Sequence, residues 1–484
     1  MEYLYDKLTN YSNSDYYGFH MPGHKRNREV LEGEFPFNID ITEIEGFDDL
    51  HHARGILQEA QKRAAEVFCA EESHFLVNGS TVGILSAVLG CTERGNRILI
   101  ARNCHKSVYN GVYLNGLTPV YVYPEYIAEM GFNGEIRTYE VEQALDLNPD
   151  IKAVIITSPT YDGVVSDIRR IADLVHRRNI PLILDEAHGA HFGFHPYFPE
   201  NGNMLGADIV IQSLHKTLPA LTQTAVLHIN GDIVDRERVR KYLHMLQSSS
   251  PSYVLMASID ECVRLLSEKK EVLFQSYVKR LDKMRKELSN LENLHLAETE
   301  HYDRAKVVIT VPDRLKKTNA ETNKFTGKEL YDILNQKYLL QMEMAAESYA
   351  IAMTSLADTD EGMDRLVKAL FEIDGKLAKY GSGERKPAKC EGAELFSGIE
   401  GNQVVCSPFE AEKRKAERGS EAVPFEECEG RIALEFAYVY PPGIPAAVPG
   451  ERILAGTVEM LDRYRKAGLR IEGVKNEGKI EVLI

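Results

Sequence analysis

The sequence has no long uninterrupted run of apolar residues, and its N-terminus has no basic stretch followed by an apolar one. A membrane-spanning helix needs about 20 mostly apolar residues, so the first absence argues against a membrane protein. The second absence argues against a secretory signal peptide. We therefore predict a cytoplasmic protein with no membrane partner.

Cysteines are few and scattered along the chain. The seven of them form no Cys-x-x-Cys pair, and their number is odd. This pattern disfavours both a disulfide framework and a zinc ribbon. Histidines gather at His51 and His52 and again at His188, His191 and His195. Adjacent His51 and His52 would point in different directions from a helix or a strand, and Gly189 and the aromatic residues of the second group suggest the wall of a loop. We therefore predict no metal site.

The chain also has no excess of basic residues over acidic ones. Aspartate and glutamate number 73 against 57 lysines and arginines, which gives a formal net charge of −16 at pH 7. Because no basic stretch is dense enough to follow a phosphate backbone, we predict no nucleic-acid partner. The 484 residues, 44% hydrophobic and 27% charged, are typical of a globular protein with two or three domains.

The sequence does contain a regular alternation of strand and helix patterns between residues 73 and 217. Short apolar runs rich in β-branched residues predict buried strands, and stretches with helical spacing separate them. This alternation is typical of an α/β fold with one parallel sheet and crossover helices. The predicted strands are 74–77, 97–101, 117–123, 153–156, 181–184 and 208–212, and the predicted helices are 58–67, 84–89, 141–145 and 168–178.

Polar clusters follow most of these strands. Because the carboxyl ends of parallel strands meet at one edge of a sheet, we expect the clusters to form one ligand site there. The Ser/Thr turn at 78–83 opens a helix and offers backbone N–H groups to an anion, although Ser and Thr are also ordinary N-caps. The other clusters are 103–107, 157–163, 185–191 and 213–217.

Two residues of these clusters point to the chemistry. Lys216 follows a strand end, where an amine beside an anion site suits an imine link to a carbonyl cofactor. Asp185 ends another buried strand, and a buried carboxylate needs a partner such as a protonated pyridine nitrogen. Ser213 and His215 offer donors to a phosphate group. His105 suits either stacking on an aromatic ring or an ordinary loop position.

The ordered motifs resemble those of one enzyme family. NGST at 78–81, CHKS at 104–107, TSPTYDG at 157–163, DEAHGAH at 185–191 and SLHKT at 213–217 resemble the fold-type-I, pyridoxal-phosphate-dependent Orn/Lys/Arg decarboxylases. The resemblance extends over nearly the whole chain through HMPGHK at 20–25, DITEIEGFDDLH at 40–51, SSSPSYVLMASID at 248–260, YPPGIP at 440–445 and VPGE at 448–451. The chain begins almost at the HMPGHK segment, without the N-terminal wing domain of the large inducible members. It is therefore similar to the short biosynthetic arginine decarboxylases of Gram-positive bacteria.

The resemblance implies catalytic roles for several motif residues. Lys216 holds pyridoxal 5′-phosphate (PLP) as an imine, Asp185 pairs with its pyridine nitrogen, and His105 stacks on its ring. Ala187 and His188 line the cofactor and the reacting carbon. Either His188 or the released Lys216 returns a proton to that carbon.

The resemblance also implies how the rest of the cofactor is bound. Thr160 lies near the phenolic oxygen of the cofactor. The region of Ser249 reaches the phosphate of the neighbouring subunit, because active sites in this family form at the interface of a homodimer. The phosphate itself is held by Ser80, Thr81, Ser213 and His215.

The chain as a whole is predicted to have five parts. These are an N-terminal arm at 1–40, a PLP-binding large domain at 41–290, a small α/β domain at 291–375, a linker at 376–394 and a C-terminal domain at 395–484. The aromatic residues of the arm favour docking on another surface over a disordered tail. The C-terminal half is predicted to hold helices at 259–291, 327–335 and 360–373 and a strand at 305–311.

The substrate side chain is expected to be cationic, so its site needs an acidic residue. Candidates are Glu435, in a strand-like stretch at 432–436, and a carboxylate from residues 40–49. The consecutive prolines of YPPGIP impose a rigid turn, which suits either a structural role or contact with the substrate.

We predict PLP-dependent decarboxylation of a basic amino acid in polyamine biosynthesis. Arginine to agmatine is the first choice, followed by lysine to cadaverine and ornithine to putrescine. Another fold-type-I enzyme, an aminotransferase or aldolase, is an alternative that would require an arginine in the small domain to bind the α-carboxylate. A third hypothesis is a non-catalytic PLP-binding protein, and the pair of Lys216 and Asp185 argues against it.

Overall fold

The computed structural model describes residues 2–17, 19–27, 33–127, 129–312, 325–377, 402–439, 444–466 and 470–484. By its internal contacts the chain divides into two units. Unit 1 comprises Met1–Cys91, Ile168–Ser276 and Ser355–Ala357, and unit 2 comprises Thr92–Asp167, Tyr277–Thr354 and Asp358–Ile484. Each unit combines pieces of several segments predicted from the sequence, so the five-part division stays a prediction.

Unit 1 begins with an N-terminal helix that is anchored to the rest of the unit. Helix α1 (Leu4–Ser12) buries Leu4 and Leu8 completely. The backbone N–H of Leu4 donates to Oδ2 of Asp260 (2.8 Å), and Oδ1 of Asp260 accepts from Arg63 (2.7 Å). Beyond α1 the aromatic side chain of Phe19 is 91% exposed. The start of the predicted arm is therefore packed, whereas its aromatic segment is open to solvent.

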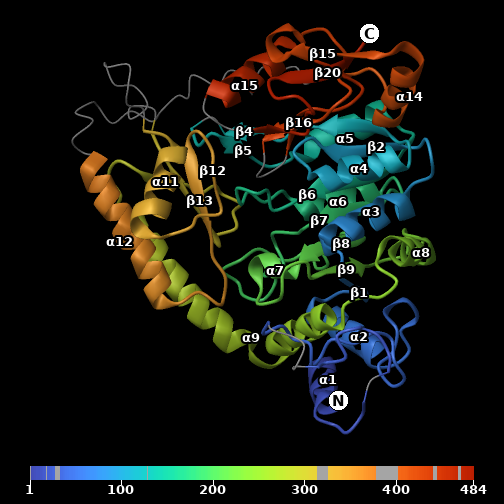
Figure 1. The fold of residues 1–484 in the computed structure, drawn as a ribbon. Helices are drawn as coiled ribbons and strands as arrows, with labels where there is room; N and C mark the ends of the chain where they lie inside the picture. The colour runs from blue at the N-terminus through green and yellow to red at the C-terminus, as the bar shows by residue number, and fades with distance from the viewer. Residues whose placement is uncertain are drawn as a thin grey trace. The chain divides into compact units, whose positions relative to one another are not determined.

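Four strands of the central sheet belong to unit 1. Their order is β1 (Glu72–Leu76), β9 (Ala225–Ile229), β8 (Ile209–Ser213) and β7 (Leu182–Asp185). Strands β7 and β8 are parallel, but β9 runs antiparallel to both of its neighbours. The helices of this unit include η1 (Leu50–His52), α2 (Ile56–Val67), α3 (Gly79–Cys91), α6 (Ile168–His176), α8 (Arg236–Leu246) and the first part of α9 (Tyr253–Leu288) (Figure 1).

The strands of unit 1 that were predicted between residues 73 and 217, β1, β7 and β8, run in one direction as predicted, because β9 is antiparallel to both β1 and β8. Strand β1 enters the sheet through the antiparallel β9, which was not predicted from the sequence. Residues 214–224, which connect β8 to β9, are too few for a crossover, so the chain turns back and pairs antiparallel. The sheet is mostly parallel, as the fold class requires.

Three further strands of the central sheet belong to unit 2. Strands β6 (Ile151–Thr157), β2 (Arg97–Ala101) and β3 (Thr118–Val122) lie in this order and are parallel. They confirm the strands predicted at 153–156, 97–101 and 117–123. Helices α4 (Lys106–Leu114) and α5 (Thr138–Leu147) and the hairpin of β4 (Tyr126–Ile127) and β5 (Phe132–Asn133) accompany them.

Unit 2 also contains a smaller antiparallel sheet with the helices that the sequence predicts. Its strand order is β10 (His295–Leu296), β11 (Lys306–Thr310), β13 (Tyr349–Met353) and β12 (Met344–Ala345). Helix α11 (Gly327–Tyr338) begins with a capping box formed by Thr326 and Glu329, which explains its sharp start. Helix α12 (Asp360–Leu377) follows β13.

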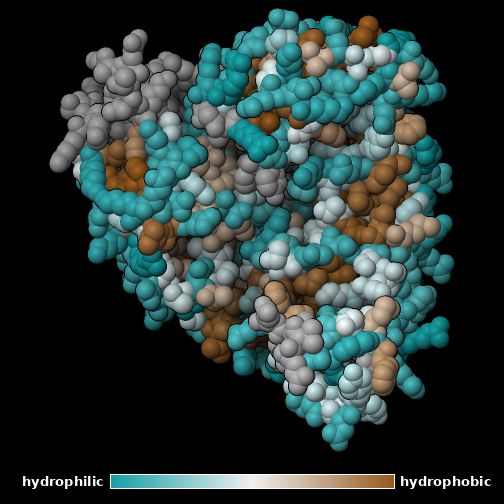
Figure 2. Space-filling model, viewed as in Figure 1, coloured by the Kyte–Doolittle hydropathy of each residue, from teal (hydrophilic) through white to brown (hydrophobic). Residues whose placement is uncertain are grey.

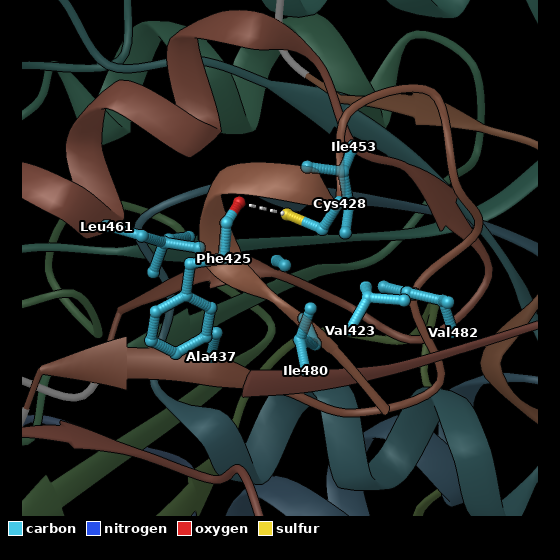
Figure 3. Packing of buried hydrophobic residues seen from close by; sticks show 11 residues of the cluster. Val423, Phe425, Cys428, Ala437, Ile453, Leu461, Ile480 and Val482 are labelled. Atoms are coloured by element: carbon cyan, nitrogen blue, oxygen red, sulfur yellow. Dashed lines mark hydrogen bonds between the residues drawn. The ribbon is translucent and has the colours of Figure 1, made fainter. Parts of the chain in front are cut away.

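The C-terminal part of unit 2 has a core of its own. Figure 3 shows Val423, Phe425, Ile453, Leu461 and Ile480 packed together, and each is less than 9% exposed. The thiol of Cys428 donates to the carbonyl oxygen of Phe425 (3.0 Å) in the same cluster. The elements are β14 (Gln403–Val404), α14 (Pro408–Arg418), β15 (Ser420–Pro424), η3 (Phe425–Glu427), β16 (Ala437–Val439), β17 (Pro445–Ala447), β18 (Glu451–Arg452), α15 (Ala455–Lys466), β19 (Ile471–Glu472) and β20 (Lys479–Leu483).

Two predictions for this region need comment. The stretch 432–436 is not a strand, because only isolated bridges at Ile432 and Ala433 connect it to its neighbours. Residues 440–443 of the YPPGIP motif and residues 378–394 of the predicted linker lie outside the described residues.

The surface agrees with the composition. Hydrophilic residues cover most of the face shown in Figure 2. Within the described ranges, the structure contains no helix that is long and apolar enough to cross a membrane.

A buried ion pair joins the VPGE motif to the end of β2 within unit 2. Nη2 of Arg102 lies 3.2 Å from Oε2 of Glu451, and both side chains are almost completely buried. The guanidinium also donates to the carbonyl oxygen of Pro445 (2.6 Å), and Glu451 accepts from Asn402 (3.1 Å) and from the N–H of Val448 (3.0 Å). Burial raises the pKa of Glu451, whereas Arg102 and these donors oppose the rise.

We expect Glu451→Ala to destabilise unit 2 by about 3–5 kcal/mol, because it leaves the Arg102 guanidinium buried without its carboxylate. Denaturant unfolding and limited proteolysis of the C-terminal part measure the loss. Asp282→Ala, which breaks the exposed pair of Asp282 with Lys286, is the control and should cost less than about 1 kcal/mol. An unchanged unfolding midpoint for Glu451→Ala would show that the buried pair contributes nothing.

Candidate active site

The predicted lysine lies on a one-turn helix at the end of a buried strand. All five residues of β8 are buried, and α7 (Leu214–Thr217) follows directly. Nζ of Lys216 is 3.1 Å from Nε2 of His188, which comes from the loop after β7 and is 7% exposed. The amine and the imidazole are therefore within hydrogen-bond distance, so a proton can pass between them.

Asp185 is the last residue of β7, beside β8 in the sheet. Its side chain is 2% exposed, and Oδ1 accepts a hydrogen bond from the N–H of Ala187 (3.2 Å). Burial raises the pKa of Asp185, while the positive charge of Lys216 and the Ala187 N–H oppose the rise. A second cation at this carboxylate would stabilise the ionised form further.

The Ser/Thr turn predicted to bind an anion forms the first turn of α3. Gly79 has a φ of +73°, a conformation that favours glycine, and its N–H donates to the carbonyl oxygen of Gln223 (3.0 Å). The hydroxyls of Ser80 and Ser213 are 2.6 Å apart, so the start of α3 meets the end of β8. Thr81 is exposed in the same turn. Hydroxyls and N–H groups at a helix N-terminus suit a phosphate.

His215 has a defined proton arrangement. Its Nδ1 lies 2.8 Å from the carbonyl oxygen of Thr224, so Nδ1 carries the proton and donates it. Burial, and to a smaller extent the charge of Lys216, lowers the pKa of His215. In the neutral ring Nε2 is an acceptor. Nε2 can therefore donate a hydrogen bond to a phosphate only when the ring is protonated, a state that the negative charge of the phosphate favours.

Ser249 lies in the exposed loop between α8 and α9. The N–H of its neighbour Ser248 donates to Oδ1 of Asn78 (3.1 Å), immediately before α3. The carbonyl oxygen of Ser248 accepts from Nε2 of His51 (2.8 Å). The loop is thus tied to the start of α3, and the contact with a neighbouring subunit stays a prediction.

The structure brings seven predicted residues of unit 1 together through the ends of β7 and β8 and the start of α3. They are Ser80, Asp185, Ala187, His188, Ser213, His215 and Lys216. His105 and Thr160 belong to unit 2, so their roles stay predictions.

Each of these two residues has a fixed local geometry. His105 is the N-cap of α4, and its Nδ1 accepts from the N–H of Ser107 (3.2 Å). Thr160 is buried, and its hydroxyl accepts from the N–H of Val164 (3.0 Å).

Glu435 belongs to the C-terminal part of unit 2 and is 7% exposed. Its two carboxylate oxygens accept from the backbone N–H groups of Lys475 (3.1 Å) and Glu481 (2.8 Å). The carboxylate therefore has a structural role, and its contact with a substrate stays a prediction.

A buried hydrogen-bonded group behind the site was not predicted from the sequence. Oε2 of Glu186, the residue after Asp185, accepts from Nε2 of Gln212 (2.6 Å), the residue before Ser213. The DEAH motif contains a second carboxylate, which was the available signal. Within the described ranges, no three or more His, Cys, Asp or Glu residues form a group that could hold a metal ion.

The fold is that of known amino acid decarboxylases. The structure of the constitutive lysine decarboxylase of E. coli superimposes with a TM-score of 0.81 and covers 99% of this chain and 82% of that one, at 21% identity. This likeness establishes a fold-type-I α/β enzyme fold.

Sequence comparison identifies the family. The model of the Orn/Lys/Arg decarboxylase major domain matches residues 3–326, and that of the C-terminal domain matches residues 393–477. Arginine decarboxylase of Halalkalibacterium halodurans is 32% identical over 95% of this chain and 92% of its own length. Arginine decarboxylase of Bacillus subtilis is 31% identical over 97% and 95%. The chain belongs to the Orn/Lys/Arg decarboxylase family, and it is a decarboxylase of a basic amino acid.

Proposed function

We propose that the chain uses PLP to decarboxylate arginine to agmatine and CO2. The observation that carries this proposal is the buried Asp185 carboxyl group near the Lys216 amine, at neighbouring strand ends. Lysine and ornithine are the alternative substrates. Arginine is preferred because the relatives named arginine decarboxylase are more similar in sequence than the lysine decarboxylase whose fold the chain shares.

The residues of unit 1 fit the chemical groups of PLP. Lys216 offers an amine to the aldehyde, and the desolvated Asp185 carboxyl group offers an acceptor to a protonated ring nitrogen. The hydroxyls of Ser80 and Ser213, with the first turn of α3, offer donors to the phosphate. Thr81, His215 and Ser249 are proposed to complete the phosphate site, and His105, Thr160 and Ala187 to line the ring.

The side chains of this site have distinct tasks in the reaction. Bound PLP supplies an electron sink for the negative charge that the loss of CO2 leaves on the substrate carbon. Asp185, when ionised, keeps a proton on the ring nitrogen. His188 and Lys216 are within hydrogen-bond distance of one another, so either can hold the proton that the substrate carbon finally receives.

Further parts of the proposal come from the sequence alone. We propose a homodimer in which Ser249 serves the neighbouring active site, together with a cytoplasmic location and a role in polyamine biosynthesis. An aminotransferase or aldolase activity and non-catalytic PLP binding are the outcomes that would replace decarboxylation.

The first experiment measures the reaction itself. The purified protein is incubated with PLP and arginine, lysine or ornithine in separate reactions, and CO2 and the amine product are quantified. We expect equimolar CO2 and agmatine from arginine, with the highest kcat/KM of the three substrates. Transamination without CO2 would overturn the proposal.

The second experiment tests the role of Lys216. Lys216→Ala should lose the visible absorbance that PLP acquires when it is joined to a lysine, and it should also lose decarboxylation, because no other amine takes its place. The exposed Lys241 of α8 provides the control, since Lys241→Ala should keep both signals. Persistence of the visible band in Lys216→Ala would show that another residue binds the aldehyde.

The third experiment tests Glu435. If its carboxylate also binds the cationic side chain of the substrate, Glu435→Gln should raise KM for arginine about tenfold, since one charged hydrogen bond is worth about 1.5–3 kcal/mol. An unchanged KM for all three basic amino acids, with a lower melting temperature, would show that Glu435 has only a structural role, through its bonds to Lys475 and Glu481. Glu472→Gln, at a partly exposed position of β19, is the matched control.

A further inference from the structure

A buried carboxyl group lies directly behind the candidate active site. Glu186 follows Asp185 at the end of β7 and is 2% exposed. Its Oε1 accepts from the N–H of Gly202 (2.9 Å), and its Oε2 accepts from Nε2 of Gln212 (2.6 Å). Its own N–H donates to the carbonyl oxygen of Ile211 (3.0 Å) in β8. Glu186 therefore connects the ends of β7 and β8 through both its side chain and its backbone.

The hydrogen bonds continue across the remaining strands of unit 1. Oε1 of Gln212 lies 3.1 Å from Nε2 of His228 in β9, and Nδ1 of His228 lies 2.7 Å from Oγ of Ser73 in β1. Gln212 and His228 are completely buried and Ser73 is 4% exposed. These four residues, Glu186, Gln212, His228 and Ser73, form what we call the strand-end network.

The donors and acceptors of the strand-end network are mutually consistent. Ser73 donates its hydroxyl proton to His228, His228 donates from Nε2 to Gln212, and the Gln212 amide donates to Glu186. Burial lowers the pKa of His228 to about 3, so its ring is neutral. Burial also raises the pKa of Glu186 to about 8, so its protonated form dominates at neutral pH.

The loop that carries His188 packs on Glu186. The N–H of Gly189 donates to the carbonyl oxygen of Glu186 (2.9 Å). A Cβ atom at Gly189 would lie 2.7 Å from Cγ of Glu186, so a glycine is required for this close approach. Glu186 thus contacts the loop of His188 through its backbone carbonyl and its Cγ, and it contacts Gln212, the residue before Ser213, through its carboxyl group.

A merely structural core does not require these polar groups. Apolar residues of the same volume would fill the space between the strands without burying any polar group. The presence of a buried polar network therefore needs another explanation. Its bonds have fixed lengths and directions, whereas apolar contacts tolerate small shifts. The network therefore restricts the spacing of two strand ends that carry Asp185 and Lys216.

We propose that Glu186 is a positioning residue, which through Gln212 and the loop at Gly189 fixes the distance of Asp185 and His188 from Lys216. The inference rests on the proposed function, because the distances matter for PLP held between these residues. It adds a residue that touches neither the substrate nor the cofactor.

Glu186→Leu tests the inference by removing both acceptors. We expect kcat to fall about 10- to 100-fold, as for other small misplacements of catalytic groups, with KM changed much less. PLP should bind more weakly in an absorbance titration, and the pH midpoint of its visible band should move. A lower melting temperature with unchanged kcat and pH midpoint would overturn the inference.

Two matched variants separate positioning from general damage. Glu186→Gln should keep kcat near the wild-type value, because the whole network can reverse its direction: the introduced side-chain amide then donates to Gln212, Gln212 to His228, and His228 to Ser73. Ser73→Ala, at the far end of the network, should also leave kcat and the band midpoint unchanged. Loss of activity in Ser73→Ala equal to that in Glu186→Leu would overturn the role of Glu186.

Gln212→Met tests the same connection if Glu186→Leu does not fold. It removes only the bridge, and the protonated Glu186 keeps its bond from Gly202. A wild-type kcat and band midpoint in Gln212→Met would then overturn the inference. If the wild-type protein releases no CO2, the proposed function fails, but PLP affinity and the band midpoint of these variants still test the positioning role.

Discussion

The burial of the Asp185 carboxyl group near the Lys216 amine is the interaction on which the candidate site depends. A buried carboxylate loses its hydration, and its pKa rises unless positive charge or N–H groups replace the lost water. Lys216 and the N–H of Ala187 supply part of that replacement. Asp185 is opposite Ile211 in the parallel pair of β7 and β8, so the register of that pair determines how far apart the two functional groups lie.

The strands and helices that the sequence predicted correctly are those whose signal is local. The apolar run at 153–156 and the helical spacing at 168–178 carry their structure in a few neighbouring residues, and β6 and α6 confirm them. The place of β1 in the sheet was not predictable in the same way, because its pairing partner is β9, which lies about 150 residues away in the chain. The stretch 432–436 shows the converse: its residues suit a strand, but no neighbouring strand pairs with it beyond isolated bridges.

The residues of the candidate site also differ in whether a local sequence signal or only the fold reveals them. The positions of Lys216 and Asp185 were predictable because Lys216 follows an apolar strand and Asp185 ends one, and polar residues at such positions are candidates for ligand sites in α/β sheets. The role of Glu186 was not predictable, since its partners Gln212, His228 and Ser73 lie on three other strands. The tautomer of His215 depends likewise on the carbonyl oxygen of Thr224, a contact that only the fold creates. Sequence patterns therefore predicted the strand-end groups proposed to face a ligand but not the buried groups behind them.

The neutrality of the strand-end network follows from its burial, which raises the pKa of Glu186 and lowers that of His228. Adjacent residues of an extended strand project to opposite faces, so Asp185 and Glu186 place two carboxyl groups one residue apart. If both were ionised in a medium of low dielectric constant, their repulsion would raise the pKa of Asp185 further. A pKa of about 8 keeps Glu186 protonated at neutral pH, so it adds no negative charge beside Asp185. The folded state then binds a proton that an unfolded glutamate, with a pKa of about 4.3, has already lost at neutral pH. The contribution of Glu186 to stability is therefore full below that value and declines as the pH rises towards 8. Above that pH the Glu186 carboxylate keeps its bonds from Gln212 and Gly202, and a second negative charge develops behind the site, which disfavours ionisation of Asp185.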